Sequence, residues 1–337
     1  MYIYAKVVRQ VRCEKMSISA MSQRLSLSRL PGPLSAAFCV IGAATTCLWT
    51  LRLAQNLIAY LRPSTLPRFN PDGKDAWALV TGASDGIGFG FAQELSKRGF
   101  NVFLHGRSSE KLARRQEELQ AEFPTTKYRI IVSDASNVSE NIDSMATVVG
   151  DAPLTVLVNN VGGESRPYRG LAELTYEDTR NTIHTNAMFM AQVTRALLPV
   201  LEKNGPSLVL NISSVASYGI PFVPVYSGTK GFVDSFTYSL RGEMRADKKN
   251  VEVQCVRVGN VQSAGNDAEI GMATPDSRSM AAGALNRVGS GALVIGHWRH
   301  LLPVASVDLF PRSLLTPHMV QTMRELRKKD DAKAKNA

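Results

Sequence analysis

The feature that most constrains the fold is an alternation of apolar runs with helical patterns along the middle of the chain. Short, almost continuously apolar runs occur at residues 76–82, 101–106, 128–134, 154–160, 207–214 and 251–259. Helical periodicity fills the segments between them, at 86–98, 110–122, 139–149, 176–201 and 226–245. Strands without polar alternation are typical of parallel sheets that helices cover on both faces. The pattern predicts an α/β fold, a Rossmann-like doubly wound parallel sheet that binds ligands at its carboxyl edge.

The net charge of +10 comes from the two ends of the chain. Residues 1–62 carry eight basic residues and one acidic residue, residues 324–337 add a second basic excess, and the charges between 63 and 323 balance. A nucleic-acid-binding domain concentrates basic charge on the fold itself, so no nucleic-acid partner is expected. The ends are interpreted as flanks at a membrane surface, and solvated tails without a partner are the alternative for the C-terminal charge.

One segment near the N-terminus is apolar enough to enter a membrane. Leu34–Leu51 is uncharged over 18 residues, which is the lower limit of a membrane-spanning helix. A signal peptide and a helix buried in a soluble domain are the alternatives. The body of the chain holds only Cys255 of the four cysteines, so it has no internal disulfide and suits a reducing compartment. Since no Cys/His cluster has metal-ligand spacing, no metal site is expected.

These features divide the chain into six parts. In order, they are a basic extension (1–33), a membrane anchor segment (34–61), a proline-containing linker (62–74), the α/β domain (75–290), a segment that packs on the body or lies at a membrane surface (291–323) and a basic tail (324–337). The first 15 residues are expected to be dispensable. Tyr218 and residues 263–285 are expected to cover the substrate, the latter as a mobile lid because it is rich in glycine, alanine and methionine.

The turn after the first predicted strand has the composition of a dinucleotide-binding site. Its sequence is Thr81-Gly82-Ala83-Ser84-Asp85-Gly86-Ile87-Gly88, with glycines spaced Gly-x-x-x-Gly-x-Gly. Glycines at such a turn let the backbone approach a pyrophosphate, whose charge the following helix N-terminus stabilises. The residues expected to contact the cofactor here are Gly82, Ser84, Asp85, Gly86, Ile87 and Gly88.

The end of the second predicted strand indicates which cofactor is bound. An acidic residue at this point would bind the ribose 2′-hydroxyl of NAD, but the sequence is His105-Gly106-Arg107-Ser108. Arg107 and Ser108 can contact a 2′-phosphate instead. NADP(H) is therefore favoured over NAD(H), and the alternative is that Arg107 is an ordinary surface residue at a strand end.

A tyrosine and a lysine in the helix at 226–245 are the expected catalytic pair. Their i, i+4 spacing puts Tyr226 and Lys230 on one face of that helix. The ordinary pKa of a phenol is about 10, and a neighbouring ammonium group favours the phenolate and brings this pKa nearer to neutrality. Ser213, at the end of the preceding strand, is expected to reach the same substrate carbonyl. A tyrosine and a lysine with this spacing often occur on helices by chance, so the catalytic assignment depends on the other motifs.

Together these motifs resemble the short-chain dehydrogenase/reductase family over residues 75–262. The resemblance implies that Asn186 holds a water in a proton relay with Ser213, Tyr226 and Lys230. It implies that Lys230 binds the nicotinamide ribose beside Tyr226. It also implies cofactor contacts from Asp134, Asn159, Val261 and Ser263. The sequence departs from the family at Val258, where a proline usually precedes the glycine.

The segment from Trp77 to Arg107 is similar to a narrower group, the membrane-bound very-long-chain 3-oxoacyl-CoA reductases and their 17β-hydroxysteroid dehydrogenase type 12 relatives. This resemblance implies NADPH-dependent reduction of a ketone on a lipophilic, 3-oxoacyl-CoA-like substrate. It also implies an endoplasmic reticulum membrane enzyme with its catalytic domain in the cytosol. The alternatives are a hydroxysteroid or fungal polyketide ketoreductase and a catalytically silent nucleotide-binding scaffold. The expected partners are the ketone or alcohol substrate, a membrane and a second copy of the chain.

Overall fold

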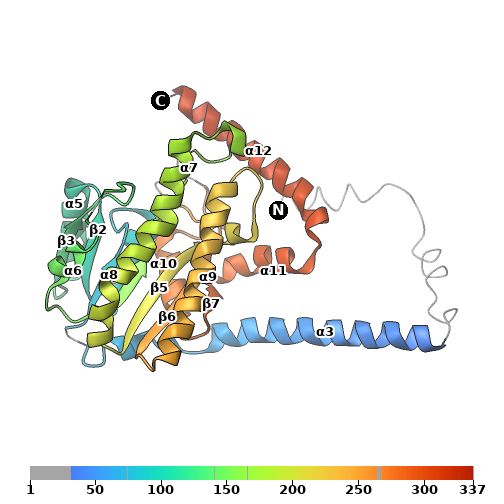
Figure 1. The fold of residues 1–337 in the computed structure, drawn as a ribbon, viewed down its shortest axis with the longest axis horizontal. Coiled ribbons are helices and arrows are strands. Elements are labelled where there is room, and N and C mark those ends of the chain that lie inside the picture. Colours follow the sequence, from blue (N-terminus) through green and yellow to red (C-terminus); the bar gives the residue numbers. More distant parts are fainter. Residues whose placement is uncertain are drawn as a thin grey trace. The chain divides into compact units, whose positions relative to one another are not determined.

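The computed structural model describes residues 32–336, apart from positions 74, 140, 165, 264, 265 and 267. The chain divides into two units, residues 1–58 and 59–337. The described part of the first unit belongs to helix α3 (Gly32–Leu61), drawn in blue in Figure 1. Its stretch Gly32–Leu51 is long and apolar enough to cross a membrane, and none of that stretch is buried. The predicted basic extension lies almost entirely outside the described residues.

The second unit contains a seven-stranded parallel sheet with the order β3-β2-β1-β4-β5-β6-β7 (Figure 1). The strands are β1 (Trp77–Val80), β2 (Asn101–Gly106), β3 (Tyr128–Val132), β4 (Leu154–Asn159), β5 (Ser207–Ser214), β6 (Val251–Val258) and β7 (Leu293–Ile295). The strand order reverses between β1 and β4, which is the point where doubly wound sheets bind ligands. The predicted fold class is therefore confirmed.

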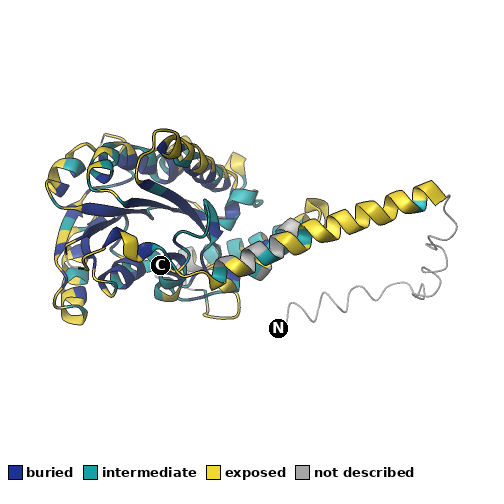
Figure 2. Cartoon of the chain, turned by 90° about the horizontal axis from the view of Figure 1, so that it is seen from below, coloured by how far each residue is buried: buried dark blue, intermediate teal, exposed yellow. Residues whose placement is uncertain are grey.

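Helices cover both faces of this sheet, and the strand side chains divide alternately between two cores. Ala78 and Val80 of β1 contribute to the core with α4, α5 and α10, whereas Trp77 and Leu79 contribute to the core with α6, α8 and α9. Figure 2 shows the buried sheet between the two helical layers. The helices are α4 (Gly86–Ser96), α5 (Ser109–Glu122), α6 (Ser144–Val149), α7 (Tyr176–Ile183), α8 (Phe189–Lys203), α9 (Pro224–Ala246), α10 (Ser277–Leu285), α11 (Leu301–Leu309) and α12 (Arg312–Asn336).

The core extends beyond the expected limits of the α/β domain at both ends. Leu66 and Phe69, in a 3₁₀ turn of the segment predicted as a linker, are 2% and 0% exposed and belong to the core. At the other end, β7 pairs with β6 beyond the predicted boundary at residue 290. The prolines that indicated a linker include Pro67, which lies in the first turn of the 3₁₀ helix, where a missing N–H costs little.

The segment predicted as a mobile lid ends in a core helix. Helix α10 buries Met280, Ala281 and Leu285 and packs closely on α4. A Cβ at Gly90 of α4 would lie 2.7 Å from the Ser277 carbonyl oxygen, so glycine permits this approach. The lid prediction is therefore wrong for residues 277–285, because small residues there serve close helix packing. Residues 269–273, in the loop before α10, are exposed, with Met272 85% accessible.

Replacing Phe69 with alanine should lower the free energy of unfolding by about 3–5 kcal/mol, because a fully buried aromatic side chain is removed. Urea unfolding of the full chain in detergent, followed by tryptophan fluorescence, measures the change. Phe310→Ala is the matched control, since Phe310 is 53% exposed and its loss should cost less than about 1 kcal/mol. Equal effects of the two substitutions would show that the 3₁₀ turn is not part of the core.

Candidate active site

The glycine turn lies between β1 and α4, at the carboxyl edge of the sheet. Gly82 and Gly86 have φ angles of 69° and 54°, which glycine adopts at little cost. A Cβ at Gly88 would lie 2.0 Å from the Gly82 carbonyl oxygen, so only glycine allows the turn to close. Asp85 caps α4 by accepting a hydrogen bond from the Gly86 N–H. The turn thus presents the N-terminus of α4 to an anionic ligand.

Four of the predicted cofactor contacts lie in this turn or were expected beside it: Ser84, Ile87, Val261 and Ser263. The Ser84 hydroxyl lies beside Gly106, and Ser263 packs against Gly86, with its Cβ 3.3 Å from where a Gly86 Cβ would stand. Ile87 packs against the core, and Val261 is buried within it. Val261 can therefore meet a cofactor only through its backbone.

Two arginines belong to this region, Arg107 directly after β2 and Arg115 in α5. Arg107 is exposed, and its contact with a 2′-phosphate stays a prediction. The Ser108 hydroxyl caps α5 by accepting a hydrogen bond from the Lys111 N–H at 3.3 Å. Arg115 was not predicted. Its Nε donates to the Ser84 carbonyl at 3.2 Å, and its guanidinium lies 4.4 Å from the centre of the Phe89 ring. No sequence signal identified Arg115, because only the tertiary packing brings the middle of α5 beside the turn.

Asp134 and Asn159 lie at the ends of β3 and β4, respectively. Ser136 donates two hydrogen bonds to the Asp134 carboxyl, one from its backbone N–H and one from its hydroxyl. The bond from the N–H is the main cause that lowers the pKa of this carboxyl, and the bond from the hydroxyl adds to it. Asn159 is 3% exposed, and its amide donates to Thr194 Oγ1 at 2.9 Å and Asn211 Oδ1 at 2.8 Å. The prediction of a cofactor contact is therefore wrong for the Asn159 side chain, which is enclosed between the sheet and its helices.

The neighbouring asparagine, rather than Asn159, faces the glycine turn. The Asn160 side-chain amide donates to the Thr81 carbonyl at 3.0 Å, and its backbone N–H donates to Thr81 Oγ1 at 2.9 Å. A Cβ at Gly88 would lie 2.6 Å from Asn160 Nδ2. Asn160 therefore connects the end of β4 to the turn.

Tyr226, Lys230 and Asn186 come together at the carboxyl edge of the sheet. Lys230 Nζ lies 5.6 Å from the centre of the Tyr226 ring. A Cβ at Gly162 would lie 2.7 Å from Asn186 Oδ1 and 3.0 Å from Lys230 Nζ, so both polar groups converge on this glycine. Lys230 Nζ also donates to the Ile212 carbonyl at 2.9 Å. The pair expected from the i, i+4 spacing and the asparagine of the long helix thus share one site.

Asn186 lies in a π-helical turn, His184–Met188, between α7 and α8. Such single turns inside α-helices are frequent at functional sites. The Asn186 amide binds the loop after β4 through both of its ends. Its Nδ2 donates to the Gly163 carbonyl at 2.6 Å, and its Oδ1 accepts from the Gly163 N–H at 2.8 Å. Asn186 therefore fixes the backbone that leads into Glu164.

Ser214 is the serine that faces Tyr226. Successive side chains of a strand point to opposite faces, and Ser213 is 2% exposed with its hydroxyl donating to the Lys230 carbonyl at 3.1 Å. The Ser214 hydroxyl accepts a hydrogen bond from the Ala216 N–H at 3.1 Å and also bonds the Tyr226 side chain. The prediction that Ser213 polarises the substrate is therefore wrong. Spacing from Tyr226 selected the wrong one of two adjacent serines.

Burial moves the pKa values of the ionisable groups in this site. Desolvation raises the pKa of Tyr226, a hydrogen bond with Ser214 opposes that rise, and the Glu164 carboxylate adds to it. Desolvation lowers the pKa of Lys230 to about 8. Glu164 has its Oε1 buried without a hydrogen-bond partner among the described residues, and burial raises its pKa to about 7. The expected lowering of the Tyr226 pKa toward neutrality is therefore wrong, because burial raises this pKa instead. Near neutral pH, Tyr226 is a protonated phenol that can donate its proton.

The departure from the family at Val258 is accompanied by a contact from the C-terminal segment. The Gly259 N–H donates to His300 Nδ1 at 3.1 Å, and His300 Nε2 lies 3.0 Å from the Asn260 carbonyl oxygen. His300 is 1% exposed, and burial lowers its pKa, which favours the neutral ring that this pattern needs. The loop after β6 is thus held by His300 in a chain that has no proline there.

The sequence is similar to those of known proteins over most of the second unit. A family model described as short chain dehydrogenase matches residues 76–271. The very-long-chain 3-oxoacyl-CoA reductase of Anas platyrhynchos is 31% identical over 261 residues, which cover 76% of this chain and 82% of the relative. The protein of the same name from Coprinopsis cinerea is 35% identical over 198 residues, 58% of each chain. The chain spans 54–60% of the length of three such curated relatives.

The fold is similar to those of solved short-chain dehydrogenases. A 7β-hydroxysteroid dehydrogenase superposes with a TM-score of 0.64 at 17% identity, covering 74% of this chain and 96% of the other. A short-chain dehydrogenase from Sphingobium yanoikuyae, solved in complex with NADPH, gives a TM-score of 0.59 at 22% identity, with coverage of 69% and 92%. At these identities the likeness concerns the fold alone.

Ser214→Ala should lower kcat for ketone reduction by about 10²–10³, the usual loss when a hydrogen-bond donor to a reacting oxygen is removed. Ser213→Ala should lower kcat by less than about 10-fold and the free energy of unfolding by about 1 kcal/mol, because it removes only one of the hydrogen bonds that join α9 to β5. Steady-state kinetics and urea unfolding of both variants separate the two roles. A larger kinetic defect in Ser213→Ala would reverse this assignment.

The kcat/KM for reduction should fall as the pH rises through about 8, the pKa of Lys230. This pKa lies below the ordinary value of 10.5, so the ammonium group is present below pH 8 and lost above it. Because kcat/KM reports ionisations of the free enzyme, initial rates at low substrate concentration are the measurement. Between pH 8 and 10.5 the unfolded chain binds the extra proton, so this group makes stability rise with pH. A profile that stays level up to the ordinary lysine range would contradict the burial of Lys230.

Proposed function

Because the chain belongs to the short-chain dehydrogenase family, we propose that it is an oxidoreductase that uses NADPH to reduce the ketone of a 3-oxoacyl-CoA-like substrate to a secondary alcohol. The observation that carries the proposal is the convergence of Tyr226, Lys230 and Asn186, with Ser214, at the ligand-binding edge of the sheet. The relatives named very-long-chain 3-oxoacyl-CoA reductase support the substrate class. The complete set of polar groups disfavours a catalytically silent scaffold.

The residues around the glycine turn fit a dinucleotide. The turn at Gly88, which has no room for a side chain, would hold the pyrophosphate at the start of α4. Arg107 and Arg115 would hold a 2′-phosphate, and Asp134 would meet the adenine. Lys230 would bind the nicotinamide ribose. When bound, the cofactor supplies the hydride.

The protein's own groups supply the proton and the polarisation of the carbonyl. Tyr226 donates its phenolic proton to the substrate oxygen, and Ser214 donates a hydrogen bond to the same oxygen. The Lys230 ammonium favours the phenolate that this transfer leaves behind. Asn186 holds the Gly163 backbone beside Lys230. This contact would fix the groups through which a proton returns to Tyr226.

The apolar stretch Gly32–Leu51 would anchor the enzyme in a membrane. We propose that this membrane is the endoplasmic reticulum and that the catalytic unit lies in the cytosol, as the resemblance implies and as the lipophilic substrate class favours. Cytosolic placement also suits the free thiol of Cys255, which is buried in the body. A second copy of the chain remains a proposed partner.

Tyr226→Phe should lower the rate of NADPH oxidation by at least about 10³-fold, because the phenolic proton donor is lost. Cofactor binding, measured by NADPH fluorescence, should survive in this variant. The assay uses 3-oxoacyl-CoA substrates with NADPH and NADH in parallel, and NADPH should be preferred. Turnover retained by Tyr226→Phe would contradict the mechanism. A wild-type enzyme that reduces no 3-oxoacyl-CoA would contradict the proposed substrate class.

A further inference from the structure

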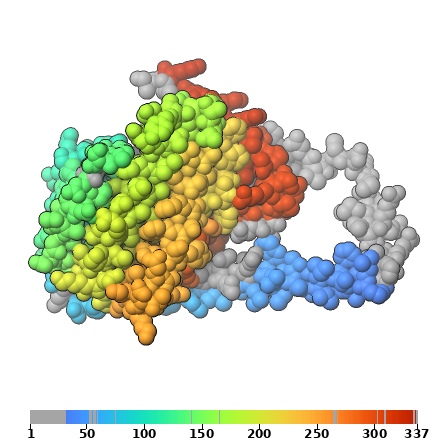
Figure 3. Space-filling model, viewed as in Figure 1, coloured from blue at the N-terminus to red at the C-terminus, as the bar shows by residue number. Residues whose placement is uncertain are grey.

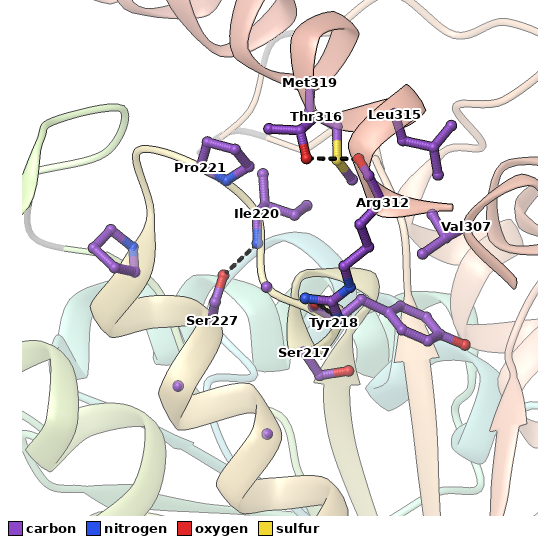
Figure 4. A pocket seen from close by; sticks show the side chains of 14 residues that line it. Ser217, Tyr218, Ile220, Pro221, Ser227, Val307, Arg312, Leu315, Thr316 and Met319 are labelled. Carbon is purple, nitrogen blue, oxygen red and sulfur yellow. Dashed lines mark hydrogen bonds between the residues drawn. The ribbon is translucent and has the colours of Figure 1, made fainter. Parts of the chain in front are cut away.

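Two hollows of the second unit lie at opposite ends of helix α9. Figure 3 shows the surface of α9, yellow at the start of the helix and orange at its end. At the start, a hollow of about 570 Å³ lies beside the catalytic centre, and Figure 4 shows Met319 of α12 above Ile220 of the turn before α9. At the end, a second hollow of about 320 Å³ lies between α9, the start of β6 and the segment after α3. This arginine cleft is named after Arg68, Arg241 and Arg245 in its lining.

The arginine cleft is far from the reacting groups. Tyr226 lies in the first turn of the 23-residue helix α9 and Arg245 in its last turn. About 28 Å of helix therefore separates the two residues, at a rise of about 1.5 Å per residue. The glycine turn also lies at the carboxyl edge of the sheet, whereas the cleft lies where β6 begins. The cleft is thus part of neither the substrate site nor the cofactor site.

The lining of the arginine cleft carries excess positive charge. Glu252 is the acidic residue of the lining, and its carboxylate is shared between Arg68, at 3.5 Å, and Arg241, at 3.8 Å. Both distances exceed the usual length of charge-assisted hydrogen bonds, about 2.7–2.9 Å. Lys249 also lines the cleft, but Glu202 neutralises it at 2.6 Å. Three guanidinium groups therefore share one carboxylate.

Arg245 is the least compensated of these cations. Its guanidinium forms neither an ion pair nor a hydrogen bond with any residue that the structure describes. Arg241 lies one turn earlier on α9, and like charges with this spacing destabilise a helix. Burial, and then the charge of Arg245, lower the pKa of Arg241. The helix dipole favours a cation at the end of α9, but it does not explain why Arg68, from another segment, lines the same cleft.

A phosphate group fits both the charge and the size of the arginine cleft. Arg241 donates to the Val253 carbonyl at 2.7 Å, and Arg68 donates to Asn250 Oδ1 at 3.4 Å. Since a guanidinium has five N–H donors, these contacts leave further donors for an anion that accepts several hydrogen bonds. Arginine binds phosphates in this way. A volume of about 320 Å³ is at the lower end of the range for small-molecule sites, so it suits a compact group.

The place of the cleft along the chain indicates where such a phosphate comes from. Arg68 lies 17 residues after Leu51, the end of the apolar stretch, and two further arginines and no acidic residue lie between them. Basic residues just outside a membrane-spanning helix attract the anionic lipids of the membrane surface. The Ser64 hydroxyl donates to the Leu285 carbonyl of α10 at 2.6 Å. The chain is therefore fixed to the second unit soon after α3 ends.

We propose that the arginine cleft binds a phosphate group, and that the source of this group is the headgroup of an anionic phospholipid. Arg241 and Arg245 bind the phosphate oxygens from α9, and Arg68 binds them from the segment after α3. A headgroup bound here would attach the end of the catalytic unit opposite the active site to the membrane surface. The lipid source rests on the proposed membrane anchor, whereas the phosphate site rests on the second unit alone.

The test uses the full chain in detergent micelles that contain equal amounts of dioleoyl phosphatidic acid and dioleoyl phosphatidylcholine. Native mass spectrometry should show that the wild type retains phosphatidic acid in preference to phosphatidylcholine. Arg245→Gln should retain at least about 10-fold less phosphatidic acid, because it loses charge-assisted hydrogen bonds. Lys248→Gln is the matched control, since Lys248 is exposed and does not line the cleft. It loses the same charge nearby and should retain as much phosphatidic acid as the wild type.

Three results would overturn the inference. A wild type that retains no phosphatidic acid would contradict the lipid source. Equal retention by the wild type and Arg245→Gln would show that the lipid associates without the cleft. Calorimetric binding of glycerol 3-phosphate that depends on Arg245, without retention of phosphatidic acid, would assign the cleft to a soluble phosphate ester.

Two further measurements separate this inference from the proposed function. NADPH oxidation by Arg245→Gln should equal that of the wild type, because the cleft is far from the catalytic centre. Flotation with vesicles of phosphatidylcholine alone should occur for the wild type and both variants, because an apolar anchor needs no anionic lipid. Failure of the reductase or of the anchor is therefore observed in a different experiment from failure of the cleft.

Discussion

Two hydrogen bonds join α9 to the end of β5, and the geometry of the catalytic centre depends on them. Lys230 Nζ donates to the Ile212 carbonyl, while the Lys230 carbonyl accepts from the Ser213 hydroxyl. A buried ammonium group is unfavourable without a hydrogen-bond partner, so the bond to the Ile212 carbonyl also stabilises the charge of Lys230. Ser213 is used in this junction, and the strand alternation then leaves Ser214 to face Tyr226. The different roles of Ser213 and Ser214 therefore follow from the way in which α9 is bound to β5.

Close backbone approach has a similar double role elsewhere in the second unit. Gly88 lets the cofactor turn close on itself, and Gly162 lets Asn186 and Lys230 reach the same point. Gly90 brings α10 onto α4. The first two glycines shape the site and the third shapes the core. All three glycines act because they lack a Cβ, which leaves room for the neighbouring group.

The fold and much of the site could be predicted from the sequence because their signals are local. Apolar runs specify buried strands, and the turn at Gly82–Gly88 and the Tyr226–Lys230 spacing each lie within one element. The errors concern properties that packing decides. Asn159 and Ser213 are the right residue types at a strand end, but the face that each presents depends on what lies beneath it. Arg115 reaches the cofactor turn only because α5 packs there. β7 is too short to show a periodic pattern, and small residues in α10 indicated mobility although they serve close packing.

The His300 contact makes the loop after β6 depend on the C-terminal part of the catalytic unit. The loop after β6 would border the nicotinamide, and the ring that holds it comes from the turn between β7 and α11. The C-terminal segment is therefore not a detachable appendage of a complete nucleotide-binding core. In a chimera that exchanged this segment for one without the histidine, the loop would lose both hydrogen bonds to the ring. The loop after β6 and the turn at His300 therefore have to be exchanged together in any chimera that is to keep this contact.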